Sequence, residues 1–172
     1  ALENASILAE IEDIYRPFRP KRKTRASVAR EKGLEPLAQI IAEQGKGASA
    51  EELAAAYINE EKGVLTAEDA IAGALDIIAE DISDNADFRK AIRALTYAYG
   101  FLSSKAAKEE SSVYDMYYDY NEKLKTVPSH RVLAINRGEK EEFLKASIDI
   151  SADIILNYLS RAVITNVKSP AY

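Results

Sequence analysis

Apolar residues recur at intervals of three and four along most of the chain, and this spacing constrains the fold more than any other feature of the sequence. Such runs occur at Ile7, Ile11 and Ile14, at Leu34, Leu37, Ile40 and Ile41, at Ile71, Leu75, Ile78 and Ile82, at Phe88, Ile92, Leu95 and Tyr99, and at Ile154, Ile155, Tyr158 and Leu159. This spacing places apolar side chains on one face of an α-helix. We therefore predict an all-α fold that is mostly helical.

Local signals refine this prediction. The tetrapeptides SAEE at Ser49 and TAED at Thr66 have the spacing of a capping box, which starts a helix. In one segment, apolar and polar residues alternate instead, at Leu144, Ala146 and Ile148. Alternation is typical of a strand with one buried face. We expect at most one short strand or hairpin, near residues 143–150.

The composition excludes several classes of protein. The chain has 172 residues, 47% of them hydrophobic, which is enough for one globular unit or two small lobes sharing a core. There is no cysteine, so neither disulfides nor cysteine-based zinc sites can stabilise it. No apolar run reaches the roughly 20 residues needed to span a bilayer. We expect no membrane partner and a cytoplasmic location.

The peptide YRPFRPKRKTR, residues 15–25, is strongly basic in an acidic chain, and we call it the basic strap. Between Tyr15 and Lys32 there are eight basic residues and one acidic residue, while the remainder holds 15 basic and 27 acidic residues. Pro17 and Pro20 each remove a backbone donor and favour an extended conformation. The predicted nucleic-acid contacts are Arg16, Arg19, Lys21, Arg22, Lys23, Arg25, Arg30 and Lys32.

Two partners are possible for these cations. Phosphates are one, because Lys and Arg neutralise them without reading sequence. The acidic helices of the same chain are the other, through internal ion pairs. The stretch Thr24–Ile41 also resembles a helix-turn-helix with its turn at Gly33, but apolar residues occupy most of its second helix. Contact with the phosphate backbone is therefore a better hypothesis than reading of a groove.

Four tyrosines lie close together in the segment VYDMYYDY, residues 113–120. Val113, Tyr117, Tyr120 and Leu124 continue the helical spacing, which predicts a helix here. Aromatic faces can stack on unpaired bases. The acidic residues around these tyrosines repel phosphates, so we favour packing in the core.

The segment PSHRVLAINRG is predicted to form a helix from Pro128, with His130 and Arg137 on one face. His130, Arg131 and Arg137 are candidates for binding an anion or for docking a neighbouring domain. The alternative is structural: His130 supports the adjacent strand, and Arg137 pairs with Glu139 or Glu141.

Catalytic motifs are missing. The sequence contains no G-x-S-x-G, P-loop, G-x-G-x-x-G or H-E-x-x-H motif, and it has a single histidine. Acidic pairs such as those in EDISD lack the convergent spacing of a metal cage. We predict no enzyme activity, no cofactor, no metal and no catalytic residue.

Three features together resemble the N-terminal region of the Tex family, bacterial transcription accessory proteins distantly similar to the eukaryotic elongation factor Spt-six. They are residues 11–38, residues 118–141 and the order of the helices between them. The resemblance implies helix-turn-helix character and binding of RNA or DNA without sequence preference. It also implies later resolvase-like, helix-hairpin-helix and S1 domains, which we do not find here.

On this resemblance we expect a fragment of a Tex-like N-terminal helical region in three segments. Residues 1–45 hold the basic strap and short helices, residues 46–126 form a helical body, and residues 127–172 hold the PSHR helix, the strand and a last helix. The predicted function is non-specific nucleic-acid binding through backbone phosphates. The alternative is an architectural scaffold that docks the other domains of the protein or the transcription machinery, with RNA polymerase as a further candidate partner.

Overall fold

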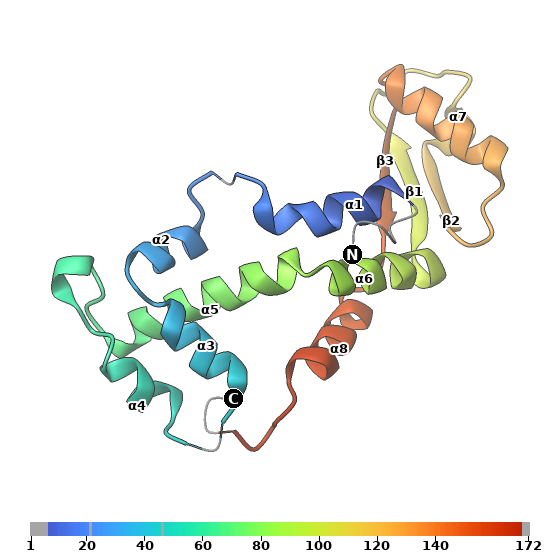
Figure 1. The fold of residues 1–172 in the computed structure, drawn as a ribbon. Helices are drawn as coiled ribbons and strands as arrows, with labels where there is room; N and C mark the ends of the chain where they lie inside the picture. The colour runs from blue at the N-terminus through green and yellow to red at the C-terminus, as the bar shows by residue number, and fades with distance from the viewer. Residues whose placement is uncertain (1–6, 21, 46, 170–172) are drawn as a thin grey trace. The chain divides into compact units, whose positions relative to one another are not determined.

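The computed structural model describes residues 7–20, 22–45 and 47–169, and they are mostly helical, as predicted (Figure 1). The chain divides into two compact units. The first comprises residues 1–89 and 159–172, and the second comprises residues 90–158. The boundaries fall within helices α6 (Ala86–Tyr99) and α8 (Ala152–Val163), so each unit includes part of both helices.

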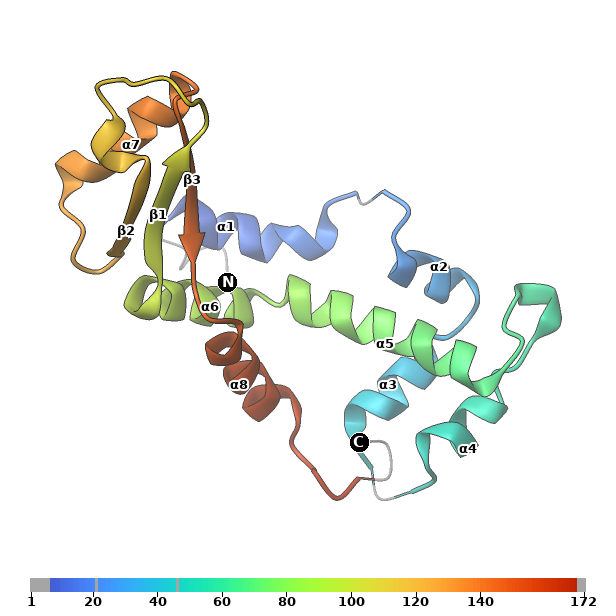
Figure 2. The same ribbon diagram turned by 180° about the vertical axis from the view of Figure 1, so that it is seen from behind.

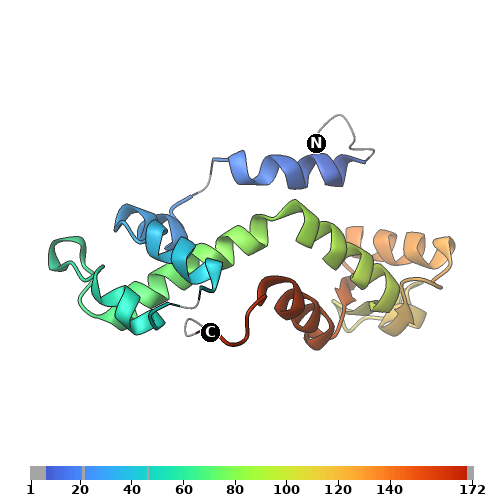
Figure 3. The same ribbon diagram turned by 60° about the horizontal axis from the view of Figure 1, so that its bottom comes forward.

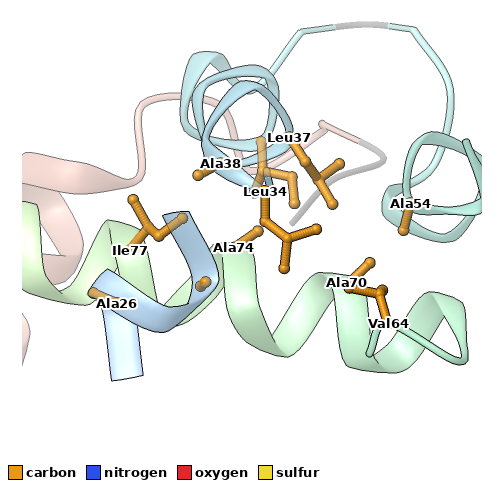
Figure 4. Close-up of a cluster of buried hydrophobic side chains, with 11 residues drawn as sticks. Ala26, Leu34, Leu37, Ala38, Ala54, Val64, Ala70, Ala74 and Ile77 are labelled. Carbon is orange, nitrogen blue, oxygen red and sulfur yellow. The ribbon is translucent and has the colours of Figure 1, made fainter. Parts of the chain in front are cut away.

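The first unit is built around the long helix α5, which packs against three shorter helices (Figure 3). Its helices are α1 (Leu8–Tyr15), α2 (Arg25–Glu31), α3 (Glu35–Glu43), α4 (Ala50–Ala55) and α5 (Ala67–Asp84), with 3-10 turns η2 (Arg16–Phe18) and η3 (Glu60–Lys62). Figure 4 shows the core between α2, α3, α4 and α5, where Leu34, Leu37 and Ile77 are fully buried among alanines. The small alanines let the helices approach closely.

Side-chain caps start three of these helices. Thr24, Ser49 and Thr66 each accept a hydrogen bond from the backbone N–H three residues later, in a reciprocal capping box. Such a cap satisfies N–H groups that have no partner within the helix. The two capping boxes predicted from the sequence are therefore confirmed. Gly33, with φ +85°, makes the turn from α2 into α3.

The second unit contains a three-stranded antiparallel sheet (Figure 2). Strand β1 (Phe101–Ala106) lies between β2 (Asp119–Lys123) and β3 (Leu144–Asp149). Helix α7 (Ser129–Lys140) packs on one face of the sheet, where Ile135 and Leu144 are fully buried. A 3-10 turn, η4 (Asp115–Tyr117), precedes β2.

The strand predicted near residues 143–150 is confirmed as β3, but it belongs to a larger sheet than the sequence indicated. The helix predicted over residues 113–124 is wrong, because that segment forms η4 and β2. Tyr118, Tyr120 and Leu124 point toward the core from alternate positions, so a strand period was present beside the helical one. Strand β1 has the sequence FLSSKA, which contains few residues that favour strands.

The basic strap also differs in part from the extended conformation expected for it. Arg16, Pro17 and Phe18 form η2, and the chain becomes extended only from Arg19, with φ −69° and ψ 132°. Proline is tolerated in the first turn of a helix, where its missing N–H would have no partner. The extended part of the strap is thus shorter than predicted.

Candidate nucleic-acid interface

Acidic residues of α5 hold the basic strap on both sides. Nε of Arg16 donates to Oδ1 of Asp84 over 2.9 Å, and Nη2 of Arg25 lies 3.3 Å from Oδ1 of Asp76. The Arg25 side chain is still 88% exposed, so its ion pair is weak. These two pairs satisfy part of the charge of the strap, and its two ends are continuous with η2 and α2.

Arg30 makes more ion pairs than the other predicted contacts that the structure describes. Its guanidinium donates to the carboxylates of Glu80 and Asp81 and also lies 3.6 Å from Glu35. The hydrogen bond to Glu80 raises the pKa of Arg30 above its ordinary value, with Asp81 contributing further. Glu80 also accepts from the hydroxyl of Thr24, the cap of α2. Arg30 therefore fastens α2 to α5 and is a poor candidate for a phosphate contact.

Three cations remain available in the strap. Arg19, Arg22 and Lys23 are exposed and make no ion pair or side-chain hydrogen bond with the residues that the structure describes. Lys21, the fourth predicted contact in this stretch, lies outside the described residues. The internal-bridging alternative thus holds for Arg16, Arg25 and Arg30, and the free charge is concentrated in the middle of the strap.

The two sides of the strap differ in electrostatic character. One groove, about 640 Å³ in volume, is lined by Lys23, Arg25 and Lys32, with Asp69 and Asp76 on its α5 side. Nζ of Lys32 donates to the carbonyl of Gly63 over 2.8 Å. The groove on the other side, about 550 Å³, is lined by the acidic residues Glu80, Asp81 and Asp84 of α5, together with Arg19 and Arg30 from the strap and α2. The first groove has one more basic than acidic side chain and the second has one more acidic than basic, so the first attracts a polyanion more strongly.

The helix-turn-helix predicted over Thr24–Ile41 has the expected elements, since α2 and α3 are joined by the Gly33 turn. Helix α3, which would have to enter a groove, contains no lysine or arginine. Its Leu37, Ala38 and Ile41 are buried. The structure therefore gives α3 little with which to contact DNA, as the sequence analysis anticipated.

In the second predicted cluster, on α7, Arg131 has an internal hydrogen-bonding partner, which His130 and Arg137 do not share. Nη1 of Arg131 donates to Oε2 of Glu122 over 2.7 Å, and the hydroxyl of Tyr120 donates to the same oxygen. The hydrogen bond from Tyr120 lowers the pKa of Glu122, and Arg131 lowers it further. Arg131 is thus engaged within the second unit, which leaves His130 and Arg137 as the exposed members of the cluster.

The internal contacts considered as alternatives for His130 and Arg137 are not formed as hydrogen bonds or ion pairs among the described residues. His130 makes no hydrogen bond there, and Arg137 forms no ion pair with Glu139 or Glu141. The carboxylate of Glu139 instead accepts the backbone N–H of Ala146, at the free edge of β3. Both side chains therefore remain candidates for contact with an external partner.

The tyrosines of residues 113–120 belong to the core, as the sequence analysis favoured. Tyr114 and Tyr117 are buried, and Tyr118 and Tyr120 pack against the same cluster. Tyr117 and Tyr120 form an edge-to-face pair with centroids 5.3 Å apart. Their rings are therefore not available as a stacking platform.

Among the described residues, no group of three or more His, Asp or Glu side chains could hold a metal ion. In the same part of the chain, no helix has the length and apolar character that crossing a bilayer requires.

Sequence reasoning did not identify the acidic residues of α5 that determine which cations stay free. Asp76, Glu80 and Asp84 each pair with a different arginine from the segment before α3. Their spacing of four places them on one helix face, so a signal for this role was present in the sequence. Assigning them to the strap still required knowledge of how α2 packs on α5.

Comparison with known proteins places this chain in a family that includes a protein named as a transcriptional accessory protein. A family model described as Tex central region-like matches residues 46–165, and the chain belongs to the Tex family. This family model describes a central region of Tex proteins. The sequence analysis placed the chain in the N-terminal region of the longer protein, and that position stays a prediction.

Three similar proteins show the extent of the match. Protein YdcI of Bacillus subtilis (strain 168) is 49% identical over 169 residues, covering 96% of this chain and 24% of that protein. Protein tex of Bordetella pertussis is 40% identical, covering 89% and 20%. Transcriptional accessory protein Tex of Neisseria gonorrhoeae is 31% identical, covering 88% and 20%. The chain thus spans a quarter or less of the length of these relatives.

Proposed function

We propose that this chain is a nucleic-acid-binding part of a transcription accessory protein and that it contacts backbone phosphates of RNA or DNA without sequence preference. It works by binding and not by catalysis, in the cytoplasm. The name of the Neisseria relative, transcriptional accessory protein Tex, supports the connection to transcription. The other domains of the longer protein and RNA polymerase are the further partners that this role implies.

One observation carries the proposal. Arg19, Arg22 and Lys23 are exposed and have no partner among the described residues, although α5 pairs with Arg16 and Arg25 on either side of them. Because the strap is fixed at its ends, its cations lose less conformational entropy on binding a phosphate chain. The three side chains come from residues outside any helix or strand and within five positions of one another, and Arg and Lys neutralise phosphates without reading bases.

The test is a fluorescence anisotropy titration of labelled single-stranded RNA and duplex DNA at several salt concentrations. Each phosphate contact contributes about −0.9 to the log–log salt slope on duplex DNA. We expect a triple variant, Arg19→Ala, Arg22→Ala and Lys23→Ala, to lose most of the affinity and to flatten the slope by about two to three. A charge-matched control changes Lys105, Lys125 and Lys145, exposed cations of the second unit, to Ala.

Equal losses in the two triple variants would show that general charge, and not the strap, attracts nucleic acid. Absence of binding at low salt by the folded chain would contradict the proposal directly.

A second candidate function, an architectural scaffold, is favoured by the surface of α1. This helix buries Asp13, which is 4% exposed and pairs with Arg89 over 2.6 Å. Its apolar stripe, in contrast, faces solvent: Ile7, Leu8, Ile11 and Tyr15, followed by Phe18. An exposed apolar stripe of this length is typical of an interaction surface. Absence of nucleic-acid binding in the titration above would leave this function as the better explanation.

A further inference from the structure

On the outward face of α7, the exposed Leu133 lies among basic side chains. The proposed function depends on the strap and does not use this face. The inner face is fixed, because Ile135 is fully buried and Gly138 lies close to β3. A Cβ added to Gly138 would come within 2.7 Å of Cδ1 of Leu144, so the helix cannot turn on the sheet without a clash. Apart from Ser129 and Glu139, the exposed residues of α7 lie along one strip of the helix, which holds His130, Leu133, Asn136, Arg137 and Lys140.

The basic residues of this face form no close ion pair among the described residues, although the charges of His130 and Glu122 interact at longer range. The other charged residues of α7 are engaged, Arg131 with Glu122 and Glu139 with the backbone of Ala146. His130, Arg137 and Lys140 form no ion pair with any residue that the structure describes. The unit as a whole contains ten basic and ten acidic residues, so the positive surplus is local to this face.

Glu141 is the residue best placed by spacing to neutralise Arg137, since it lies one turn further along. Glu141 interacts instead with the hydroxyl of Tyr114. Burial has the largest effect in raising the pKa of Tyr114, and the interaction with Glu141 raises it further. Glu141 is exposed, and Arg137 acts on the pKa of the same tyrosine in the opposite direction, but the two side chains form no ion pair with each other. Arg137 is left exposed at the centre of the outward face.

Leu133 lies between His130 and Arg137 on this face and is 61% exposed. A bound polynucleotide presents phosphates to cations, but it offers a leucine side chain little apolar surface to bury against. A protein helix can offer both, with acidic side chains flanking an apolar stripe. From His130 to Lys140 the face extends about 15 Å along the helix, which is close to three turns of a partner helix.

We propose that His130, Leu133, Arg137 and Lys140, here called the α7 face, dock an acidic amphipathic helix of a protein partner. Leu133 inserts between apolar side chains of that helix, and Arg137 and Lys140 meet its flanking carboxylates, with the imidazole of His130 beside them. The α7 face lies in the other unit from the strap and does not depend on its function.

The test uses the whole chain and a fluorescein-labelled synthetic peptide of about 18 residues, roughly five helical turns. The peptide has leucines at intervals of three and four, flanked by glutamates, and a control peptide has lysines in place of the glutamates. We expect the acidic peptide to bind and the lysine peptide not to bind. Leu133→Ser and, separately, Arg137→Glu should each weaken binding about tenfold, as expected for central positions of an interface.

Two further variants make the result specific. Lys125→Glu changes an exposed cation outside the α7 face by the same charge and should leave peptide affinity within about twofold of the unchanged chain. The strap triple variant should also bind the peptide normally, so failure of the strap proposal and failure of this one are distinguishable.

Three outcomes would overturn the proposal. The acidic peptide could fail to bind, or Lys125→Glu could weaken binding as much as Arg137→Glu. Alternatively, Arg137→Glu could abolish binding of labelled RNA while leaving the peptide affinity unchanged, which would assign the α7 face to nucleic acid. Because Leu133 and Arg137 are exposed, neither substitution should unfold the chain, and circular dichroism checks this.

Discussion

Gly73 lies where α5 passes under the turn between α2 and α3. A Cβ at this position would overlap Cδ1 of Leu34 and come within 3.4 Å of Cβ of Ala29. Leu34 is only 1% exposed and is surrounded by the core, so it has little room to move aside. A single hydrogen atom in place of a methyl group therefore permits the close packing that positions the strap.

We expect Gly73→Ala to destabilise the first unit by about 1–2 kcal/mol. Alanine gains about 1 kcal/mol of helix propensity over glycine, but overpacking a full core costs about 1–3 kcal/mol or more. Urea denaturation followed by circular dichroism measures the difference. Gly47→Ala is the control, because a Cβ there meets nothing within 4 Å. A Gly73→Ala chain more stable than the unchanged protein would show that Leu34 can move.

At the scale of elements, the pairing of Glu122 with Tyr120 and Arg131 ties β2 to α7. The hydrogen bond from Tyr120 and the guanidinium of Arg131 lower the pKa of Glu122. Folding therefore favours the ionised carboxylate over its protonated form. The stabilisation is fully present above the ordinary pKa of a glutamate, and it is lost as pH falls through the lowered value.

We expect the second unit to lose stability as pH falls below about 4.5, in part through Glu122. Glu122→Gln should be less stable than the unchanged chain at pH 7, and the difference should shrink toward pH 3. Urea midpoints measured across this range by near-ultraviolet circular dichroism of the tyrosines test this. Glu109→Gln, at an exposed residue without a described partner, should follow the unchanged chain. A constant difference between Glu122→Gln and the unchanged chain at all pH values would rule out the ionic contribution.

At the scale of the whole molecule, Gln44 joins two parts of the first unit that are far apart in sequence. Its Nε2 donates to the carbonyl of Val163 over 2.7 Å, and its Oε1 accepts the backbone N–H groups of Thr165 and Asn166, each over 2.9 Å. Ser169 donates to the carbonyl of Gly45 next to it. The end of α3 thus holds the segment after α8 through side-chain hydrogen bonds to its backbone.

We expect Gln44→Gly to release this segment without disturbing α3. Gln44 has φ 50°, a left-handed conformation that glycine adopts easily, so the substitution removes the side chain and keeps the turn. Amide hydrogen exchange at Thr165 and Asn166 should accelerate by more than tenfold, whereas exchange within α3 should not change. Gln44→Asn, which tolerates the same backbone but is too short to reach, should behave like Gln44→Gly. Unchanged protection in both variants would show that other contacts hold the segment.

The sequence by itself determined the helical class, the capping boxes at Ser49 and Thr66, the strand at residues 144–149 and the family. These features depend on short-range spacing, which the chain displays directly. Strand β1, with the sequence FLSSKA, was missed because it is stabilised by its two neighbouring strands and not by its own propensity. Strand β2 was missed because its segment also fits a helical spacing.

In the candidate site, too, the sequence determined one part and the tertiary structure decided the other. The concentration of positive charge between Tyr15 and Lys32 is a property of the sequence, so all eight basic residues could be named in advance. Which of them remain free was decided by the tertiary structure, because Asp76, Glu80 and Asp84 neutralise only the arginines that the packing of α2 on α5 brings to them. An ion pair forms between side chains a few ångströms apart, and proximity between residues 50 or more positions apart in the chain exists only in the folded molecule.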